Sequence, residues 1–165
     1  MNRTPALILA AAIFVADQAM KWFVLGPVGL AYVGDSREIL PFFDLTLVHN
    51  EGVSLGMLTA QAEWQRWGLV ALTAGIAMFV AVWLWREEGR RDALALGAIL
   101  GGAAGNIVDR VRYGYVVDYA DLHFGDFRPF LVFNVADAAI TLGVLVLLAG
   151  ALFTRRKPEA ETEHA

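Results

Sequence analysis

The sequence contains 165 residues, enough for one domain, and 58% of them are hydrophobic whereas only 18% are charged. Soluble domains average about 45–50% apolar and about 25% charged residues, so this composition argues against a soluble domain. The net charge of -4 argues against a nucleic-acid partner, and the absence of cysteine excludes disulfide bonds, thiolate nucleophiles and thiolate metal ligands.

Four apolar stretches are long enough to cross a membrane as helices, which takes about 20 residues. They cover residues 6–25, 67–85, 93–111 and 135–153. The first could be a cleaved signal peptide, but the apolar core of such a peptide has only about 7–15 residues, and this stretch also contains Asp17 and Lys21. We therefore expect an all-α membrane fold of four transmembrane helices, in a single domain that covers residues 1–165.

The connection between the first two spans, residues 26–66, is the longest segment outside the membrane. Its residues 39–48 have high β-propensity, and they stand among glycines and prolines. We expect this connection to form a small β-rich segment on the extracytoplasmic face. A shorter connection on the same face, residues 113–133, mixes aromatic residues with aspartates.

Lysine and arginine residues near the ends of the spans predict the orientation, because they concentrate on the cytoplasmic side. The relevant groups are Arg3, the arginines between residues 86 and 91, and the basic run at 155–157. An even number of spans places all three groups on one side of the membrane. We therefore expect both termini to be cytoplasmic, including the polar tail at residues 154–165.

Polar side chains of three spans converge near the extracytoplasmic side of the membrane. Ionisable residues are costly inside a bilayer and usually serve a function. The inner halves of the spans carry no charge except at their ends. A transporter needs polar groups in both leaflets, whereas an enzyme that acts at the outer surface needs them in one, so the pattern favours an enzyme. The converging residues are Asp17, Lys21, Asn106, Asp109, Arg110, Asn134 and Asp137.

Asp118, in the second outer connection, and Asp137, about one turn into the fourth span, are the best candidates for catalysis. The only serines are Ser36 and Ser54, so nucleophiles of that type are scarce. Two carboxylates held close together share one proton, because like charges cannot both ionise cheaply. One can take a proton from water while the other donates one to a substrate carbonyl. Taken singly, they would be a loop carboxylate and a favourable charge at a helix N-terminus.

The charged residues within the spans also allow a structural interpretation. Asp17 and Lys21 are four residues apart on one helix face, and we interpret them as an ion pair that neutralises two costly charges. Asp109 and Arg110 suit either a structural ion pair or the positioning of a substrate. The glycines that precede them, from Gly101 onward, are typical of membrane helices that pack closely.

Five short motifs follow one another along the chain. They are Asp17-Gln18 with Lys21, Asn50-x-Gly52 with Ser54 and Gly56, Gly101-Gly102-Ala103-Ala104-Gly105-Asn106-Ile107-Val108-Asp109-Arg110, Val117-Asp118-Tyr119, and Asn134-x-Ala136-Asp137. Together they resemble the lipoprotein signal peptidase family, also called signal peptidase II. The resemblance covers nearly the whole chain, and five motifs in order are far more specific than any one of them.

The resemblance implies an aspartic endopeptidase of the bacterial cytoplasmic (inner) membrane. Such an enzyme removes the signal peptide from diacylglyceryl-modified prolipoproteins, cutting on the N-terminal side of the lipidated cysteine. Asp118 and Asp137 would be the catalytic pair, near the extracytoplasmic face. The residues that would bind the substrate are Asn50, Gly52, Asn106, Arg110 and Asn134. Those that would form structural ion pairs are Asp17, Lys21 and Asp109.

The expected partners are prolipoproteins that bear a diacylglyceryl-cysteine, together with membrane phospholipid. We expect no cofactor, since water is the nucleophile in this chemistry. His49 and His123 occur without a metal-binding spacing, so we expect no metal site. Because one chain contains both carboxylates, we expect a monomer.

Three other functions remain open from the residues alone. A serine peptidase would use Ser54 as the nucleophile and Lys21 as the base. A small proton-coupled transporter would need polar groups in the inner leaflet, which the sequence lacks. A membrane assembly factor would use its carboxylates only structurally, so that their loss would lower stability rather than turnover.

Overall fold

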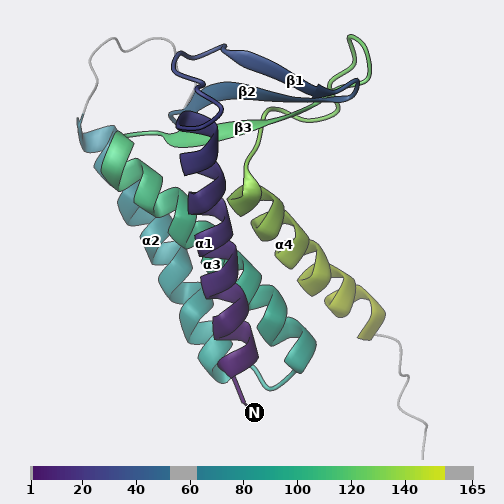
Figure 1. Ribbon diagram of the computed structural model, residues 1–165. Coiled ribbons are helices and arrows are strands. Elements are labelled where there is room, and N and C mark those ends of the chain that lie inside the picture. The colour runs from purple at the N-terminus through teal and green to yellow at the C-terminus, as the bar shows by residue number, and fades with distance from the viewer. Residues whose placement is uncertain (1, 53–62, 155–165) are drawn as a thin grey trace, which may run out of the picture.

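The computed structural model describes residues 2–52 and 63–154 of the chain. Four long helices run side by side and a three-stranded sheet covers one end of them (Figure 1). We call this end the sheet end and the opposite one the far end. The elements are α1 (Thr4–Leu25), β1 (Ser36–Leu40), β2 (Phe43–Asn50), α2 (Glu63–Arg86), α3 (Arg90–Tyr113), β3 (Val116–Leu122) and α4 (Val135–Thr154).

The four predicted spans are confirmed, because each lies within one helix that is long and apolar enough to cross a membrane. The helices are somewhat longer than the apolar stretches. The clearest case is α2, which begins at Glu63 rather than at residue 67, because its first turn is polar and carries no hydropathy signal. Residues 53–62 of the outer connection and 155–165 of the tail lie outside the described residues.

Helix α3 lies at the centre of the bundle. Half of its membrane-spanning stretch is buried, compared with 11–22% for the other three helices. Glycines make this position possible: a Cβ atom on Gly97 would lie 2.4 Å from the carbonyl oxygen of Ala6 in α1, and one on Gly102 would lie 2.5 Å from that of Ala136 in α4. The backbones of α1 and α4 therefore approach α3 more closely than a larger residue would permit.

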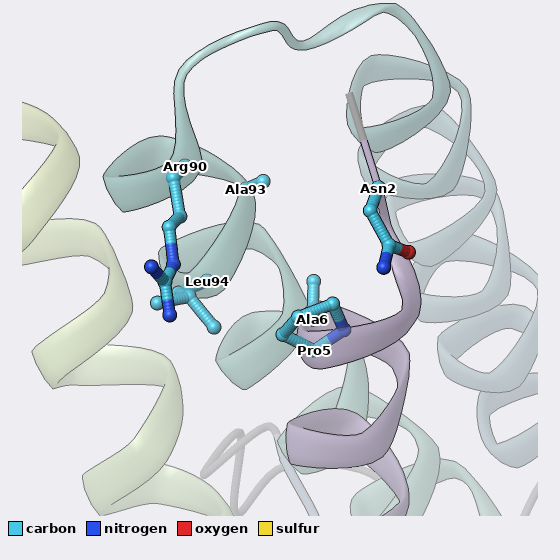
Figure 2. A pocket seen from close by; sticks show the side chains of 6 residues that line it. All are labelled: Asn2, Pro5, Ala6, Arg90, Ala93 and Leu94. Carbon is cyan, nitrogen blue, oxygen red and sulfur yellow. The ribbon is translucent and has the colours of Figure 1, made fainter.

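The far end of the bundle contains the loop between α2 and α3 and the first residue of α1 (Figure 1). A cavity of about 320 Å³ lies there, with Arg90 and Leu94 of α3 across from Pro5 and Ala6 of α1 (Figure 2). Arg3 links the start of α1 to the end of α2 at this end of the bundle, since its guanidinium donates to the carbonyl oxygens of Leu84 and Trp85.

The sheet has the antiparallel order β1-β2-β3. The predicted β-rich segment between the first two spans is confirmed by β1 and β2, and the sheet gains a third strand, β3, from the connection between α3 and α4. The pairing of β3 with β2, for example Val48 with Asp118, joins residues about 70 positions apart. Local periodicity carries no information about such a distant partner.

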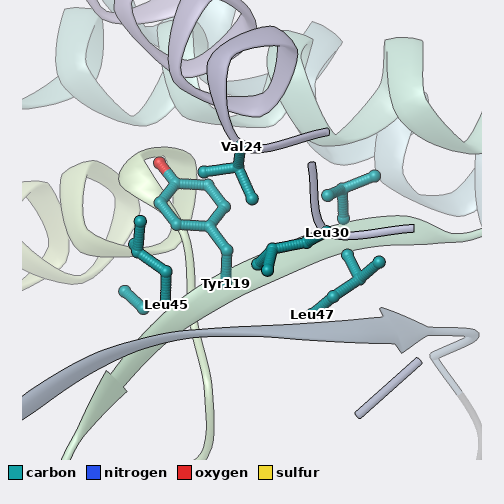
Figure 3. Close-up of a cluster of buried hydrophobic side chains, with 7 residues drawn as sticks. Val24, Leu30, Leu45, Leu47 and Tyr119 are labelled. Atoms are coloured by element: carbon teal, nitrogen blue, oxygen red, sulfur yellow. The ribbon is translucent and has the colours of Figure 1, made fainter. Parts of the chain in front are cut away.

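A cluster of buried apolar side chains attaches the sheet to the end of α1. Tyr119 of β3 points towards Val24 of α1, and Leu30 lies beside them (Figure 3). Leu45 and Leu47 of β2 complete the contact from the other strand, and all five side chains are at least 94% buried. The cluster fixes β3 relative to the end of α1, so the side chains of this strand have defined positions next to the helices.

Candidate active site

Asp118 on β3 and Asp137 in the first turn of α4 are joined by one residue, Asn134. The side-chain nitrogen of Asn134 donates to Asp118 Oδ1 at 2.7 Å. Its backbone N–H donates to Asp137 Oδ2 at 3.3 Å, and its side-chain oxygen accepts from the backbone N–H of Asp137 at 2.9 Å. This reciprocal arrangement is a capping box, which satisfies free N–H groups at the start of α4 and fixes the direction of the Asp137 side chain.

Two further asparagines supply the remaining donors. Asn50, at the end of β2, donates to Asp118 Oδ2 at 3.0 Å. Asn106 of α3 donates to Asp137 Oδ1 at 2.9 Å. Each of the four carboxylate oxygens therefore accepts a hydrogen bond from an asparagine, and the site is assembled from β2, β3, α3 and the start of α4.

The environment of Asp118 favours its protonated form. Its side chain is nearly inaccessible to water, and the negative charge of Asp137 lies nearby. Burial, followed by that charge, raises the pKa of Asp118 to about 6, against the lowering effect of the donors Asn50 and Asn134. A carboxyl group with this pKa holds or releases a proton near neutral pH, as a general acid or base must.

Arg110 of α3 brings a positive charge to the same place. It interacts electrostatically with Asp137, Asp118 and Asp109, in that order of strength. Its Nε atom is buried and has no hydrogen-bond partner among the described residues. An unused buried donor is unusual, and it is suited to a carbonyl oxygen of a bound peptide.

Gly52 lies between Arg110 and α2. Its φ angle of +85° is one that other residues rarely adopt, and its N–H donates to the side-chain oxygen of Asn50 at 3.0 Å. A Cβ atom here would lie 2.9 Å from the Leu69 side chain. Glycine is therefore required to close the turn that presents the Asn50 amide to Asp118.

The predicted ion pairs lie directly behind the site. Lys21 Nζ is 2.7 Å from Asp17 Oδ2 and 2.7 Å from Asp109 Oδ2. Gln18 also donates to Asp109 Oδ1, at 3.0 Å. The partner of Asp109 is thus Lys21, on another helix, and not its sequence neighbour Arg110.

A cavity of about 440 Å³ opens beside Asp118, between the end of β2 and the segment before α4. Sequence reasoning missed several residues that line it, among them Glu51, Leu131 and Val132. Leu131 is 90% exposed in the structure. The signal available in the sequence was the position of these residues, next to the predicted Asn50 and Asn134 motifs. Among the described residues, no group of three or more histidine, cysteine or acidic side chains is arranged to hold a metal ion.

Comparison with known proteins identifies the family. The sequence model described as signal peptidase (SPase) II matches residues 9–153. The chain is 54% identical over 151 residues to the lipoprotein signal peptidase of Sphingopyxis alaskensis, covering 92% of this chain and 87% of that protein. It is 53% identical over 164 residues to that of Rhizorhabdus wittichii, covering 99% and 94%. A bacterial membrane enzyme solved by the in meso method at 2.3 Å superposes with a TM-score of 0.77 and 27% identity, covering 97% of this chain and 95% of that one. This chain belongs to the signal peptidase II family.

Proposed function

We propose that the chain is an aspartic endopeptidase that removes the signal peptide from diacylglyceryl-modified prolipoproteins, cutting on the N-terminal side of the lipidated cysteine. The observation that carries the aspartic mechanism is the link between Asp118 and Asp137 through Asn134. Membership of a lipoprotein signal peptidase family supports the class of substrate.

In the proposed reaction, Asp118 and Asp137 share one proton. The ionised carboxylate takes a proton from a water molecule as that water attacks the scissile carbonyl carbon. The protonated carboxyl group donates its proton to the carbonyl oxygen, which gives a neutral tetrahedral intermediate. The carboxyl group that took the proton from water then donates it to the leaving nitrogen, while the other carboxylate takes a proton from a hydroxyl of the intermediate as the carbon–nitrogen bond breaks. The products are an amine and a carboxylic acid, and the pair again holds one proton. Acid–base catalysis by positioned groups typically contributes about 10²–10⁴-fold.

The substrate-binding residues act around this pair. The Nε atom of Arg110, which has no hydrogen-bond partner in the described part of the chain, would donate to a peptide carbonyl, and Asn50 and Asn134 hold Asp118 in place. Asn106 does the same for Asp137, while Gly52 shapes the turn beside Asn50. Hydrolysis by water needs no cofactor, and a monomer suffices because one chain supplies both carboxyl groups.

We further propose that the sheet end faces the extracytoplasmic side of the bacterial inner membrane, with both termini in the cytoplasm. The arginines at the far end support this orientation: Arg3, Arg86, Arg90 and Arg91. A lipid-anchored substrate has its scissile bond near the outer surface, at the depth of the carboxylate pair. The whole chain then acts as one integral membrane domain, with phospholipid around the helices.

The alternatives receive less support. A serine peptidase needs Lys21 to act as its base, but the Lys21 Nζ atom already contacts the carboxylates of Asp17 and Asp109, each at 2.7 Å. A transporter needs polar groups across both leaflets, and the buried polar residues of the described segments lie at the sheet end. An assembly factor does not require the cavity beside Asp118.

The test is cleavage of a purified prolipoprotein in detergent, with and without its diacylglyceryl group, by wild type and Ser54→Ala. Mass spectrometry of the products identifies the bond that is cut. Both proteins should cut the lipidated form immediately before its cysteine and leave the unlipidated form intact. Loss of activity in a folded Ser54→Ala variant, or equal cleavage of both substrates, would overturn the proposal.

A further inference from the structure

Three charged side chains are buried together between α1 and α3, in the half of the bundle nearest the sheet. Asp17, Lys21 and Asp109 are 0%, 3% and 0% exposed. Charges inside a membrane protein are costly, and replacing a buried ion pair by apolar residues is often neutral or stabilising. Simple neutralisation of charge therefore gives no reason to keep this group.

Each of the two carboxylates also holds a backbone N–H next to a candidate catalytic residue. Asp17 Oδ1 accepts from the backbone N–H of Ala136, the residue before Asp137, at 3.1 Å. Asp109 Oδ2 accepts from the backbone N–H of Val117, the residue before Asp118, at 3.1 Å. One carboxylate thus fixes the start of α4, and the other fixes the start of β3.

Lys21 joins these two supports, because its Nζ atom is 2.7 Å from each carboxylate. The surroundings leave the group little room to shift: a Cβ atom on Gly105 would lie 2.4 Å from Asp17 Oδ2. One ammonium group therefore links the support of β3 to the support of α4, behind the direct connection that Asn134 makes between Asp118 and Asp137.

Lys21 also acts on Asp137 through Asn106. Its Nζ atom donates to the side-chain oxygen of Asn106 at 3.3 Å. An ammonium group can only donate, so the amide must turn its oxygen towards Lys21 and its nitrogen towards Asp137. That nitrogen donates to Asp137 Oδ1 at 2.9 Å.

We propose that Lys21 is a positioning residue for the peptidase reaction: through Asp17, Asp109 and Asn106 it sets the relative placement of Asp118 and Asp137. The inference rests on the proposed function and adds to it, since it gives a kinetic role to a group whose evident role is structural. Placement matters because the coupling between two carboxylates determines how they share a proton. Among the described residues, the other charged or titratable groups around the pair are Arg110 of α3, Tyr119 of β3, and His49 and Glu51, which line the cavity beside Asp118.

The test uses two charge-balanced double variants, Asp17→Asn/Lys21→Met and Asp109→Asn/Lys21→Met. Each keeps the net charge of the group unchanged and removes the ammonium link. Because the remaining carboxylate loses its cationic partner, the folded fraction of each variant is measured before the assay. We expect kcat per folded molecule to fall by about 10²-fold, since misplacement by about 1 Å has effects of this size, with KM changed much less. The acidic and basic limbs of the pH profile of kcat should also move closer together, because the two carboxyl groups are less tightly coupled.

The control is Arg91→Met, which removes an exposed ion pair with Asp92 at the far end and should leave kcat and the pH profile unchanged. If the double variants keep the wild-type kcat and pH profile, whatever happens to their Tm, Lys21 is only a structural residue and the inference is wrong. Asp118→Asn and Asp137→Asn, assayed in parallel, separate the two proposals. If either retains activity, the aspartic mechanism itself is wrong. If both are inactive, the kinetics of the double variants test the role of Lys21 separately from the aspartic mechanism.

Discussion

At the scale of the residue, Asp118 is an ionisable side chain that is buried, and its burial makes the stability of the protein depend on pH. Burial and the charge of Asp137 raise its pKa to about 6 in the folded protein, from an ordinary value of 3.8. The folded protein therefore binds this proton more tightly than the unfolded chain does. The contribution to stability is fully present below about pH 4 and is lost as the pH rises through about 6.

Asp118→Asn removes this titration, because the amide is neutral at every pH. We expect the Tm of the variant, relative to that of wild type, to increase between about pH 4 and about pH 8. The corresponding free energy is on the order of 1–3 kcal/mol. The measurement is thermal unfolding in one detergent across that pH range. A difference in Tm that does not change with pH would show that Asp118 has the same affinity for its proton in both states.

The sequence predicted that two aspartates and three asparagines belong to one site, and the structure brings these five side chains together. The sequence did not predict every pairing of the charged residues nearby. Asp109 and Arg110 are neighbours in sequence, so an ion pair between them was one of the two interpretations of these residues. Successive residues of a helix point about 100° apart, however, and Asp109 faces α1 while Arg110 faces the carboxylate pair. The choice between partners depends on which helix lies alongside, and the sequence of a single helix does not specify this.

At the scale of the element, the position of α3 depends on its glycines. A Cβ atom on Gly101 would lie 2.4 Å from the backbone oxygen of Ala10 in α1, which no side-chain movement can relieve. In α2, a Cβ atom on Gly75 would meet nothing within 4 Å. The same residue type is thus required in one helix and replaceable in another.

Gly101→Ala should lower stability by about 1–3 kcal/mol, because α1 must move away from α3. Gly75→Ala is the matched control, and it should be neutral or stabilise the protein by about 0.5–1 kcal/mol, since alanine favours a helix over glycine. Thermal unfolding of both variants in the same micelles measures the difference. Equal Tm values for the two variants would contradict close packing of α1 on α3.

The helices could be predicted from the sequence because each membrane span is a long apolar stretch. Strand β3 could not be predicted in this way. Residues 116–121 are all buried, so the strand shows no alternation of polar and apolar exposure. Its edges pair with β2 on one side and with Phe133 on the other. A strand of this kind is defined by its neighbours, and these come from distant parts of the chain.

At the scale of the whole molecule, the buried polar residues and the apolar surfaces suited to lipid occupy different parts of the structure. The buried polar residues collect under the sheet, and the outer faces of α1, α2 and α4 expose large apolar side chains suited to lipid, such as Ile8, Ile76 and Leu148. Composition and the order of the polar residues were enough to predict this division. The way in which the sheet closes over the polar residues depends on the contacts of Tyr119 and Val24, which only the structure provides.

The most direct test of the account is turnover of a diacylglyceryl-modified prolipoprotein by Asp118→Asn and Asp137→Asn, with Asp121→Asn as the matched control. Asp121 lies on the same strand and is as buried as Asp118, but its carboxylate pairs with Arg128. We expect the first two variants to fold and to lose turnover by at least about 10²-fold, as removal of a general acid or base does, while Asp121→Asn remains active. Turnover that survives in Asp118→Asn or Asp137→Asn would contradict catalysis by the carboxylate pair.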